Sequence, residues 1–459
     1  MQCSGSCKAR GGSVENIENV CMVIKSSNGF GRIRINILLG FFSKFGSFIL
    51  SYISLPIALS YLGVNYYGVW IVIFSVVAWI YNFDIGIGLG LKNSLNDALV
   101  KKNYKLANEL IATAYIFLIA VSILLLLISF LLVFSINLDS IFSMSNIRES
   151  EIRTTLLVSV FFTIANFILL LYKQLFFAVN LSGFAAVTTI LYQVLVIVFL
   201  LVAKCFIEPS LLIVAIIYGV SNLFVGVFFT LYFFKRNDVL KFSFSNYKRN
   251  HIKSIGGVGI KFFIIQMCML MIFTCDNIII SKYLGPEYVT SYSLILKTYQ
   301  AFIMISYIIL TPYWTLFAEA YYQKNTEWIL KQYKKLYTLF LLMIIAVIAY
   351  SLYIQPLLKI WLHTELKFNK YMIYGFCIFV IIRVFIDLHA VFLNGIGKIN
   401  VQLVLYLFAA IINIPLAIIL IKHFNMGSEA VIFSASIAIA PMAIILPLQS
   451  LVLFRNIAK

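Results

Sequence analysis

The 459-residue chain is 62% hydrophobic and 11% charged, whereas a soluble domain is about 45–50% apolar and about 25% charged. This composition excludes a water-soluble globular protein, because too few charged residues are present to cover its surface. The formal net charge of +18 would suggest a nucleic-acid partner if the protein were soluble, so the placement of the basic residues decides what the charge means.

The first segment of the chain, residues 1–34, is polar and lacks the apolar core of a signal peptide. The first membrane span is therefore expected to direct insertion. Met22 is an alternative start, because nothing in residues 1–21 resembles an element of the expected fold. We expect residues 1–34 to lie in the cytoplasm.

Apolar runs bounded by charged or turn residues predict an all-α polytopic membrane protein with twelve transmembrane helices. The predicted spans are 35–59, 67–91, 110–134, 155–177, 184–203, 211–233, 258–283, 292–315, 336–358, 372–393, 401–422 and 430–454. They divide into two six-helix bundles, residues 35–233 and 258–454. A basic cytoplasmic linker, 234–257, joins the bundles, and 455–459 form a cytoplasmic tail.

Two loops between predicted spans, 92–109 and 317–335, are long enough for an amphipathic helix. In the first, Leu95, Leu99 and Leu106 recur at near-helical spacing. We expect both loops to lie as helices at the inner membrane interface.

The distribution of basic residues predicts the orientation of the chain. With the N-terminus inside, cytoplasmic segments hold 22 lysines and arginines and outside loops hold 8. Basic residues accumulate on the cytoplasmic side of membrane proteins, so both termini are expected to be cytoplasmic. Insertion thus accounts for most of the net charge, and we expect no nucleic-acid partner.

The chain also contains signs of an internal repeat. An offset of 222 residues superposes two short motifs, one at an outside turn and one in the first cytoplasmic loop of each half. The matches are Tyr61-Leu62-Gly63 with Tyr283-Leu284-Gly285, and Ala98, Lys102 and Asn103 with Ala320, Lys324 and Asn325. Later, an offset of 214 matches Asn180 and Gly183 to Asn394 and Gly397. Chance similarity between apolar segments is the alternative explanation.

Six spans per repeat is an even number, so both halves would insert with the same orientation, related by a pseudo-two-fold axis along the membrane normal. This arrangement is typical of transporters, in which two bundles rock about a central site and expose it to one side at a time. A transporter, and not an enzyme, is therefore expected.

Eight ionisable residues fall inside predicted spans, where each costs about 2.5–3.5 kcal/mol to insert. They are Lys44, Lys173, Lys261, Lys297, Arg383, Asp84, Asp276 and Asp387. Snorkelling to the membrane surface is an alternative explanation for Lys173, Lys261 and Asp84, which lie near cytoplasmic span ends. Arg383 and Asp387, four residues apart on one helix, could simply neutralise each other.

Cations outnumber anions among these residues, which favours an anionic substrate such as a phosphate or pyrophosphate. The candidate substrate-binding residues are Lys44, Lys261, Lys297 and Arg383, and the candidate coupling or charge-pairing residues are Asp84, Asp276 and Asp387. No metal site, cofactor or catalytic residue is predicted, because the cysteines and histidines lack metal-ligand spacing and no nucleotide-binding loop occurs.

The segment Tyr67-Gly68-Val69-Trp70, followed by Asn82-Phe83-Asp84-Ile85-Gly86-Ile87-Gly88 and Lys92-Asn93-Ser94-Leu95, resembles the second span and following loop of O-antigen flippases. These Wzx-type polysaccharide translocases belong to the multidrug/oligosaccharidyl-lipid/polysaccharide exporter (MOP) superfamily. The resemblance implies a V-shaped pair of bundles with a cationic cavity. It also implies transfer of an undecaprenyl-pyrophosphate-linked oligosaccharide across a bacterial inner membrane for lipopolysaccharide O-antigen biosynthesis, among membrane lipids and with a polysaccharide polymerase as a candidate partner.

The main alternative is a cation-coupled multidrug exporter of the same superfamily, which predicts an acidic cavity. A polysaccharide polymerase or glycosyltransferase would need a sizeable extramembrane loop carrying catalytic residues, and the longest predicted loops have only about 25 residues. The sign of the charge in the central cavity therefore discriminates between the first two functions.

Overall fold

The computed structural model describes residues 29–81, 87–142, 147–252, 260–362 and 368–457, which are helical with short connections and contain no β-strand. The first half holds α2 (Gly29–Tyr81), α3 (Ile87–Val100), α4 (Tyr104–Ser135), α5 (Asp139–Phe142), α6 (Glu149–Leu169), α7 (Leu171–Ala178), α8 (Ser182–Phe206), α9 (Leu211–Arg236) and the short 3₁₀ helix η1 (Phe244–Asn246). The second half holds α11 (Ile260–Tyr283), α12 (Pro286–Tyr322), α13 (Thr326–Leu362), α14 (Lys370–Gly395), α15 (Asn400–Lys422) and α16 (Glu429–Ile457).

Eleven helices of the described residues are long and apolar enough to cross a membrane, one fewer than the twelve predicted spans. The difference arises at α2, which runs through the first predicted span and on into the second as far as Tyr81. Gly63 interrupts α2 with φ 75° and ψ 170°, a conformation that glycine adopts without steric cost. The chain therefore turns at Gly63 between two apolar segments, as the sequence predicted.

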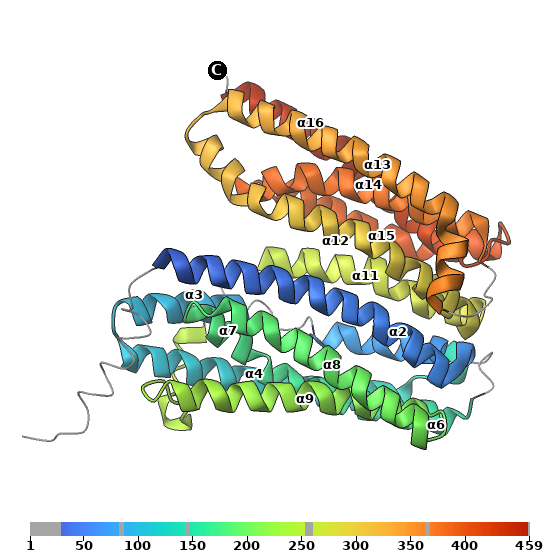
Figure 1. Ribbon diagram of the computed structural model, residues 1–459, viewed down its shortest axis with the longest axis horizontal. Helices are drawn as coiled ribbons and strands as arrows, with labels where there is room; N and C mark the ends of the chain where they lie inside the picture. Colours follow the sequence, from blue (N-terminus) through green and yellow to red (C-terminus); the bar gives the residue numbers. More distant parts are fainter. Residues whose placement is uncertain (1–28, 82–86, 143–146, 253–259, 363–367, 458–459) are drawn as a thin grey trace, which may run out of the picture.

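The helices form two bundles that together make a V (Figure 1). One bundle contains α2 to α9 and the other α11 to α16, and α2 contacts both α11 and α12 across the boundary. We call the end where the bundles diverge the basic end; it carries Lys101, Lys102 and Lys324. The far end, where the bundles meet, carries the turns at Gly63 and Gly285.

Direct hydrogen bonds between the two bundles lie toward the far end. The Thr290 hydroxyl of α12 donates to the carbonyl of Val64 at 2.6 Å. The Asn277 amide of α11 donates to the Ser75 hydroxyl of α2 at 2.8 Å, and both side chains are buried. Among the described side chains, these bonds join the bundles toward the far end, which fits the V shape.

The turns that follow α3 and α12 have the same local backbone at the offset of 222. Lys102 and Lys324 have φ values of 54° and 55°. The side chain of Asn103 accepts a hydrogen bond from the backbone three residues later at 3.0 Å, and that of Asn325 does the same at 3.0 Å. These are helix N-caps, which satisfy amide groups left free at the start of α4 and α13. The sequence match therefore coincides with a structural match.

The later offset of 214 differs from what the backbone shows. Asn180 (φ 59°) and Gly397 (φ 72°) occupy equivalent left-handed positions at the ends of α7 and α14, which gives an offset of 217. The following residues repeat the correspondence, since Leu181 donates to Phe176 at 2.8 Å and Lys398 donates to Leu393 at 2.9 Å. The asparagine match at 214 was misleading because asparagine and glycine can replace each other in this conformation.

The two expected interfacial helices have different outcomes. In the first loop, α3 buries Leu91 and Leu95 fully and packs against α4 and α7, so it belongs to the bundle. No separate helix forms over 317–335. There α12 continues to Tyr322 and α13 begins at Thr326, so the loop shrinks to the turn that the Asn325 cap closes.

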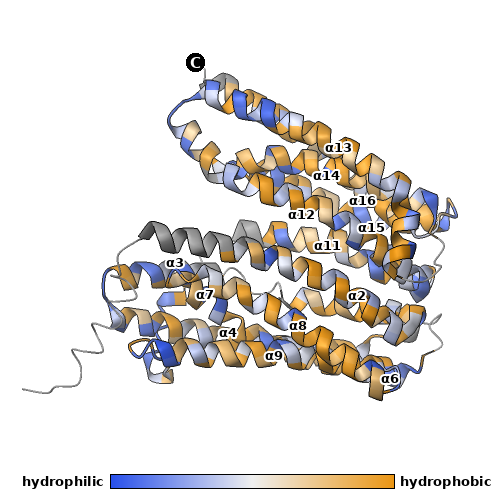
Figure 2. Ribbon diagram, in the orientation of Figure 1, coloured by the Kyte–Doolittle hydropathy of each residue, from blue (hydrophilic) through white to orange (hydrophobic). Residues whose placement is uncertain are grey.

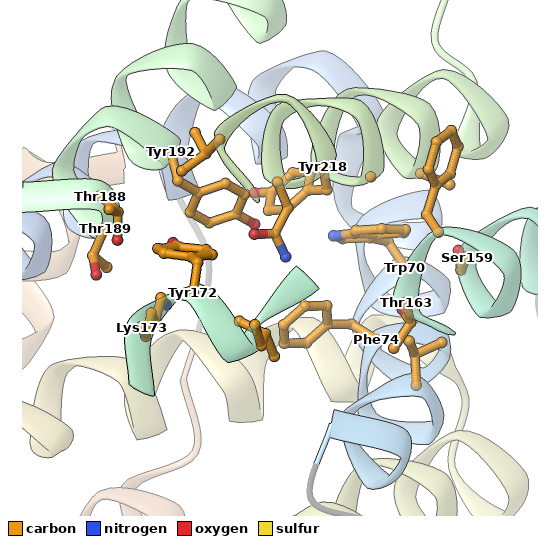
Figure 3. Close-up of a pocket in the computed structure, with 17 residues that line it drawn as sticks. Trp70, Phe74, Ser159, Thr163, Tyr172, Lys173, Thr188, Thr189, Tyr192 and Tyr218 are labelled. Carbon is orange, nitrogen blue, oxygen red and sulfur yellow. The ribbon is translucent and has the colours of Figure 1, made fainter. Parts of the chain in front are cut away.

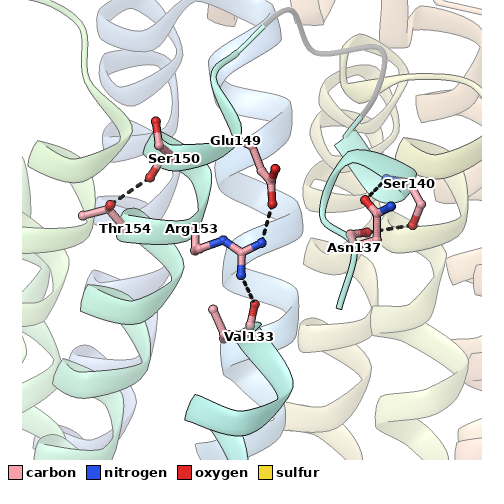
Figure 4. A network of polar contacts seen from close by, with 7 residues as sticks. All are labelled: Val133, Asn137, Ser140, Glu149, Ser150, Arg153 and Thr154. Carbon is pink, nitrogen blue, oxygen red and sulfur yellow. Dashed lines mark hydrogen bonds and ion pairs between the residues drawn. The ribbon is translucent and has the colours of Figure 1, made fainter. Parts of the chain in front are cut away.

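The surface of both bundles is apolar along the middle of the helices, and polar residues gather at their ends (Figure 2). Polar contacts fix the loops at each end. At the far end, Arg153 of α6 is bound to Glu149 and donates to the Val133 carbonyl of α4 at 2.6 Å (Figure 4). At the basic end, Asn108 of α4 accepts from the Lys241 amide at 2.8 Å, which docks the start of the linker under the first bundle.

Candidate functional site: a cavity between the two bundles

A cavity of about 580 Å³ lies between the bundles and is lined by helices of both. Three of the predicted charged residues line it, namely Asp276 of α11, Lys297 of α12 and Arg383 of α14. The first bundle contributes aromatic and hydroxyl side chains from α2, α8 and α9. The charged side chains of this central cavity are thus two cations and one carboxylate, all from the second bundle.

Lys297 is half-buried and faces α2 across the bundle boundary. Its Nζ lies 5.6 Å from the centre of the Tyr52 ring, within the range of a cation–π contact. The hydroxyl of Tyr52 also donates a hydrogen bond to the backbone carbonyl of Lys297. The backbone carbonyl of Tyr52 in turn accepts from the Trp361 indole at 3.0 Å. Tyr52 therefore ties α2 to both α12 and α13 beside the ammonium group.

Arg383 forms an ion pair along its own helix, as one of the two sequence interpretations expected. Its Nε donates to Asp387 Oδ2 at 3.0 Å, and the two side chains are 13% and 26% exposed. The guanidinium carbon lies 5.7 Å from the centre of the Phe273 ring. Within the described structure the buried Nη1 has no hydrogen-bond partner. Asp387 therefore occupies only part of the guanidinium, and donors remain for an anion.

Asp276 is 1% exposed, and its Oδ2 accepts from the Tyr292 hydroxyl at 2.7 Å. Its Oδ1 has no hydrogen-bond partner, and no described cation pairs with it. Burial disfavours the ionised form of this carboxylate, because no described counter-charge pairs with it. Asp276 is thus suited to gain and lose a proton or to hold a cation.

The other candidate residues lie away from this cluster. Lys44 is exposed on α2 toward the basic end, with its Nζ 5.8 Å from the Tyr307 ring of α12. It faces the gap between the bundles without lining the central cavity. Lys261 belongs to α11, but its side chain lies outside the described residues, as does all of Asp84. The sequence prediction for these two residues stays a prediction.

A second cavity, of about 350 Å³, lies inside the first bundle among α2, α6, α7, α8 and α9 (Figure 3). It contains Lys173, for which the sequence analysis left a position inside the bundle and snorkelling to the membrane surface as alternatives. Aromatic and hydroxyl side chains make up most of its wall. Sequence reasoning missed this cavity because tyrosines, threonines and asparagines in membrane helices are also common at interfaces and in helix packing.

Comparison with known proteins bears on the family. The MatE family model matches residues 262–419. A relative from Yersinia pseudotuberculosis, whose name proposes a role in O-antigen export, is 25% identical over 379 residues, covering 78% of this chain and 82% of that protein. The chain belongs to the MOP superfamily of transporters.

Solved structures show the same fold. An inward-facing MOP-superfamily transporter of the multidrug-resistance MATE family superposes with a TM-score of 0.74 at 16% identity, covering 93% of this chain and 98% of that one. An outward-facing structure of such a transporter gives 0.62 at 16% identity, covering 95% and 98%. The chain therefore has the fold of these transporters, and it superposes better on the inward-facing structure.

Proposed function

We propose that this MOP transporter is a flippase that moves an undecaprenyl-pyrophosphate-linked oligosaccharide, an O-antigen or similar repeat unit, across the bacterial plasma membrane by alternating access. The observation that carries the proposal is the central cavity between the bundles, where Lys297 and Arg383 stand at mid-depth with only one other charged side chain, Asp276, in the described lining. The named role of the Yersinia relative supports the same cargo class.

The physical reason for such a protein is the cost of moving a polar head through hydrocarbon. Each polar group that loses its hydrogen bonds there costs several kcal/mol, and a pyrophosphate with sugars carries many. Lys297 and the free donors of Arg383 would replace part of the water around the phosphates. The polyprenyl tail would stay in the bilayer, reaching the cavity through a lateral opening between the bundles.

The orientation follows from the basic loops, which place the basic end in the cytoplasm together with both termini. The gap at that end would then admit cargo from the inner leaflet. Lys44, beside Tyr307 in this gap, would be the first cation that a phosphate meets. Lys261 is proposed to act with it on the same cargo. A polysaccharide polymerase would receive the product on the outer side.

Asp276 is proposed as the coupling residue, since it is buried, uncompensated and adjacent to the cargo cations. Asp84 is a second candidate for coupling, while Asp387 acts in charge pairing.

The alternative is a cation-coupled multidrug exporter, which the MatE match and the named role of the MATE structures favour. The described lining of the central cavity argues against it, because a cationic drug would meet Lys297 and Arg383.

The proposal is tested by deleting the gene and measuring lipid-linked oligosaccharide on the inner face of the membrane. We expect accumulation, which the wild-type gene reverses. Genes carrying Lys297→Ala or Arg383→Ala should restore at least tenfold less transport, because a charge-assisted hydrogen bond is worth about 1.5–3 kcal/mol. Lys204→Ala at the far end is the control. Normal oligosaccharide export in the deleted strain, together with lost drug resistance, would instead identify the multidrug exporter.

A further inference from the structure

The cavity inside the first bundle lies next to the central cavity, and four side chains line both. Trp70, Phe74, Tyr192 and Tyr218 line both. The Trp70 and Tyr218 rings lie 5.3 Å apart, centre to centre, so they pack together at the boundary. The two cavities therefore adjoin each other, with these side chains forming the wall between them.

The lining of the first-bundle cavity combines flat aromatic faces with neutral hydrogen-bonding groups. Figure 3 shows the Trp70, Tyr172 and Tyr192 rings around the space, with the hydroxyls of Thr163 and Thr188 at its edges. Pockets built mainly from apolar and aromatic surface, with a few placed polar groups, are typical of small-ligand sites, and about 350 Å³ falls in their usual size range.

One polar group of this cavity is buried without a bond of its own. Ser159 is 7% exposed, and its Oγ has no hydrogen-bond partner in the described structure. An unsatisfied buried hydroxyl costs about 1–3 kcal/mol, so a ligand that bonds to it is stabilised by that amount. A pyranose ring presents C–H faces, which pack on aromatic rings, together with O–H groups, which bond to hydroxyls. This cavity offers both kinds of partner.

Among the described residues that line this cavity, Lys173 is the one that carries a charge, so the cavity is positively charged. Lys173 lies beside Tyr172 and Thr189 at one end of the space, and its Nζ is 5.9 Å from the Tyr172 ring centre. It forms no ion pair with any residue that the structure describes. An ammonium group can donate three hydrogen bonds to sugar oxygens, and it repels a cationic ligand.

We propose that the first-bundle cavity is the glycan subsite of the transporter. The pyrophosphate binds Lys297 and Arg383 in the central cavity, and the sugars attached to it reach the first-bundle cavity when the Trp70 and Tyr218 side chains move apart. Lys173 donates to the sugar and excludes cations. This inference rests on the proposed function, and it assigns sugar and phosphate to different bundles.

The division predicts that substitutions in the two bundles separate two binding reactions. The purified protein would be titrated with undecaprenyl pyrophosphate, which has no sugar, and with the lipid-linked oligosaccharide extracted from the gene-deleted strain. Binding is followed by a change in thermal unfolding temperature. Ser159→Ala and Lys173→Met should weaken oligosaccharide binding about tenfold relative to the sugar-free lipid, because each removes a side chain that bonds to the sugar.

The controls make a failure of the subsite distinguishable from a failure of the function. Val220→Leu, on the exposed face of α9, should change neither affinity. Lys297→Gln should weaken both ligands equally. If the first-bundle variants bind both ligands as wild type does, or weaken both equally, the subsite is wrong while the flippase proposal stands. If wild-type protein binds neither ligand, the flippase proposal itself fails. Retained binding of the sugar-free lipid shows that each variant is folded.

Discussion

Asp276 and Arg383 illustrate two ways in which a membrane protein keeps a charged residue inside. Arg383 has a carboxylate four residues away on the same helix, whereas Asp276 has a tyrosine hydroxyl and no described cation. The first arrangement stabilises the helix and leaves some donors for cargo. In the second arrangement the buried carboxylate is destabilising while it is ionised, and binding a proton or a cation relieves this.

Replacing Asp276 with asparagine should therefore separate stability from activity. Asp276→Asn keeps the shape and the hydrogen bond from Tyr292 but removes the buried charge, so we expect an unchanged or higher unfolding temperature. Transport should fall at least tenfold if this carboxylate couples the cycle. Both quantities can be measured on one purified preparation, with Asp97→Asn, at an exposed position of α3, as the control. Full transport by the Asp276 variant would remove it from the mechanism.

The ion pair of Arg383 should contribute more to stability than a surface pair with the same spacing. Asp387→Asn is expected to cost about 1–3 kcal/mol, less than the 3–5 kcal/mol of a fully buried pair, because both side chains are partly exposed. The matched control is Asp97→Asn, which breaks the exposed pair with Lys101 and should cost under about 0.5 kcal/mol. Denaturant unfolding in detergent gives both values, and equal costs would contradict the difference in environment.

The candidate site could be predicted only in part at this scale. The cost of charge in a membrane singled out Lys297, Arg383 and Asp276, and they do line one cavity. The same rule ranked Lys44 with Arg383 as a stronger candidate, because both lie near the middle of a predicted span, but Lys44 does not line that cavity. For Lys173, a depth judged from a span edge left both a bundle position and the membrane surface open, while the break between α6 and α7 places it against a cavity.

At the scale of the helices, the contact between α2 and α12 depends on a missing side chain. A Cβ atom built on Gly68 would lie 1.9 Å from the carbonyl oxygen of Pro286, so only glycine lets the two backbones approach this closely. This residue lies in the segment that carries the flippase resemblance. Its place at the bundle boundary gives a packing reason for glycine there, independent of cargo.

Gly68→Ala should accordingly weaken the inward-facing state. The backbones must separate at the far end, so we expect the population to shift toward an outward-open form. A cysteine at Thr290 should then react faster with a membrane-impermeant maleimide from the outside. Gly40→Ala is the control, since a Cβ there meets nothing within 4 Å. Equal labelling rates in the two variants would show that this contact does not set the equilibrium.

Helix positions were predictable because apolar runs of membrane length are long and unambiguous, and within the described residues the predicted spans fall on helices, eleven of which are long and apolar enough to cross a membrane. The exact positions at which helices end and the next ones begin could not be predicted. The Asn325 cap allows α12 and α13 to extend beyond the membrane and removes a predicted interfacial helix, and the later repeat offset is fixed by backbone conformation at Gly397 and not by residue identity.

At the scale of the whole molecule, the bonds between the bundles are unevenly distributed. Thr290 and Val64 meet toward the far end, while toward the basic end Lys44 only faces the ring of Tyr307. A transporter that rocks must break the first set when it opens outward. Locking these contacts should therefore stop the cycle after cargo has entered.

Cross-linking tests this directly. In a cysteine-free background, Val64→Cys with Thr290→Cys, joined by a short thiol cross-linker, should reduce transport to the background level, and cleavage of the linker should restore it. A pair within the first bundle, Asn108→Cys with Val239→Cys, should leave transport intact, because those residues move together. Undiminished export by the locked protein would exclude rocking of the bundles.

The position of Tyr52 links cargo binding at Lys297 to the contacts between the bundles. Its ring supports the Lys297 ammonium, its hydroxyl bonds the backbone of α12, and its carbonyl receives Trp361 of α13. A phosphate that draws the ammonium away from the Tyr52 ring would weaken the contacts by which Tyr52 holds α2 against α12 and α13. These contacts help to keep the bundles closed on the outer side. We therefore expect the transporter without cargo to stay closed on the outer side, so that ions do not leak across the membrane through it.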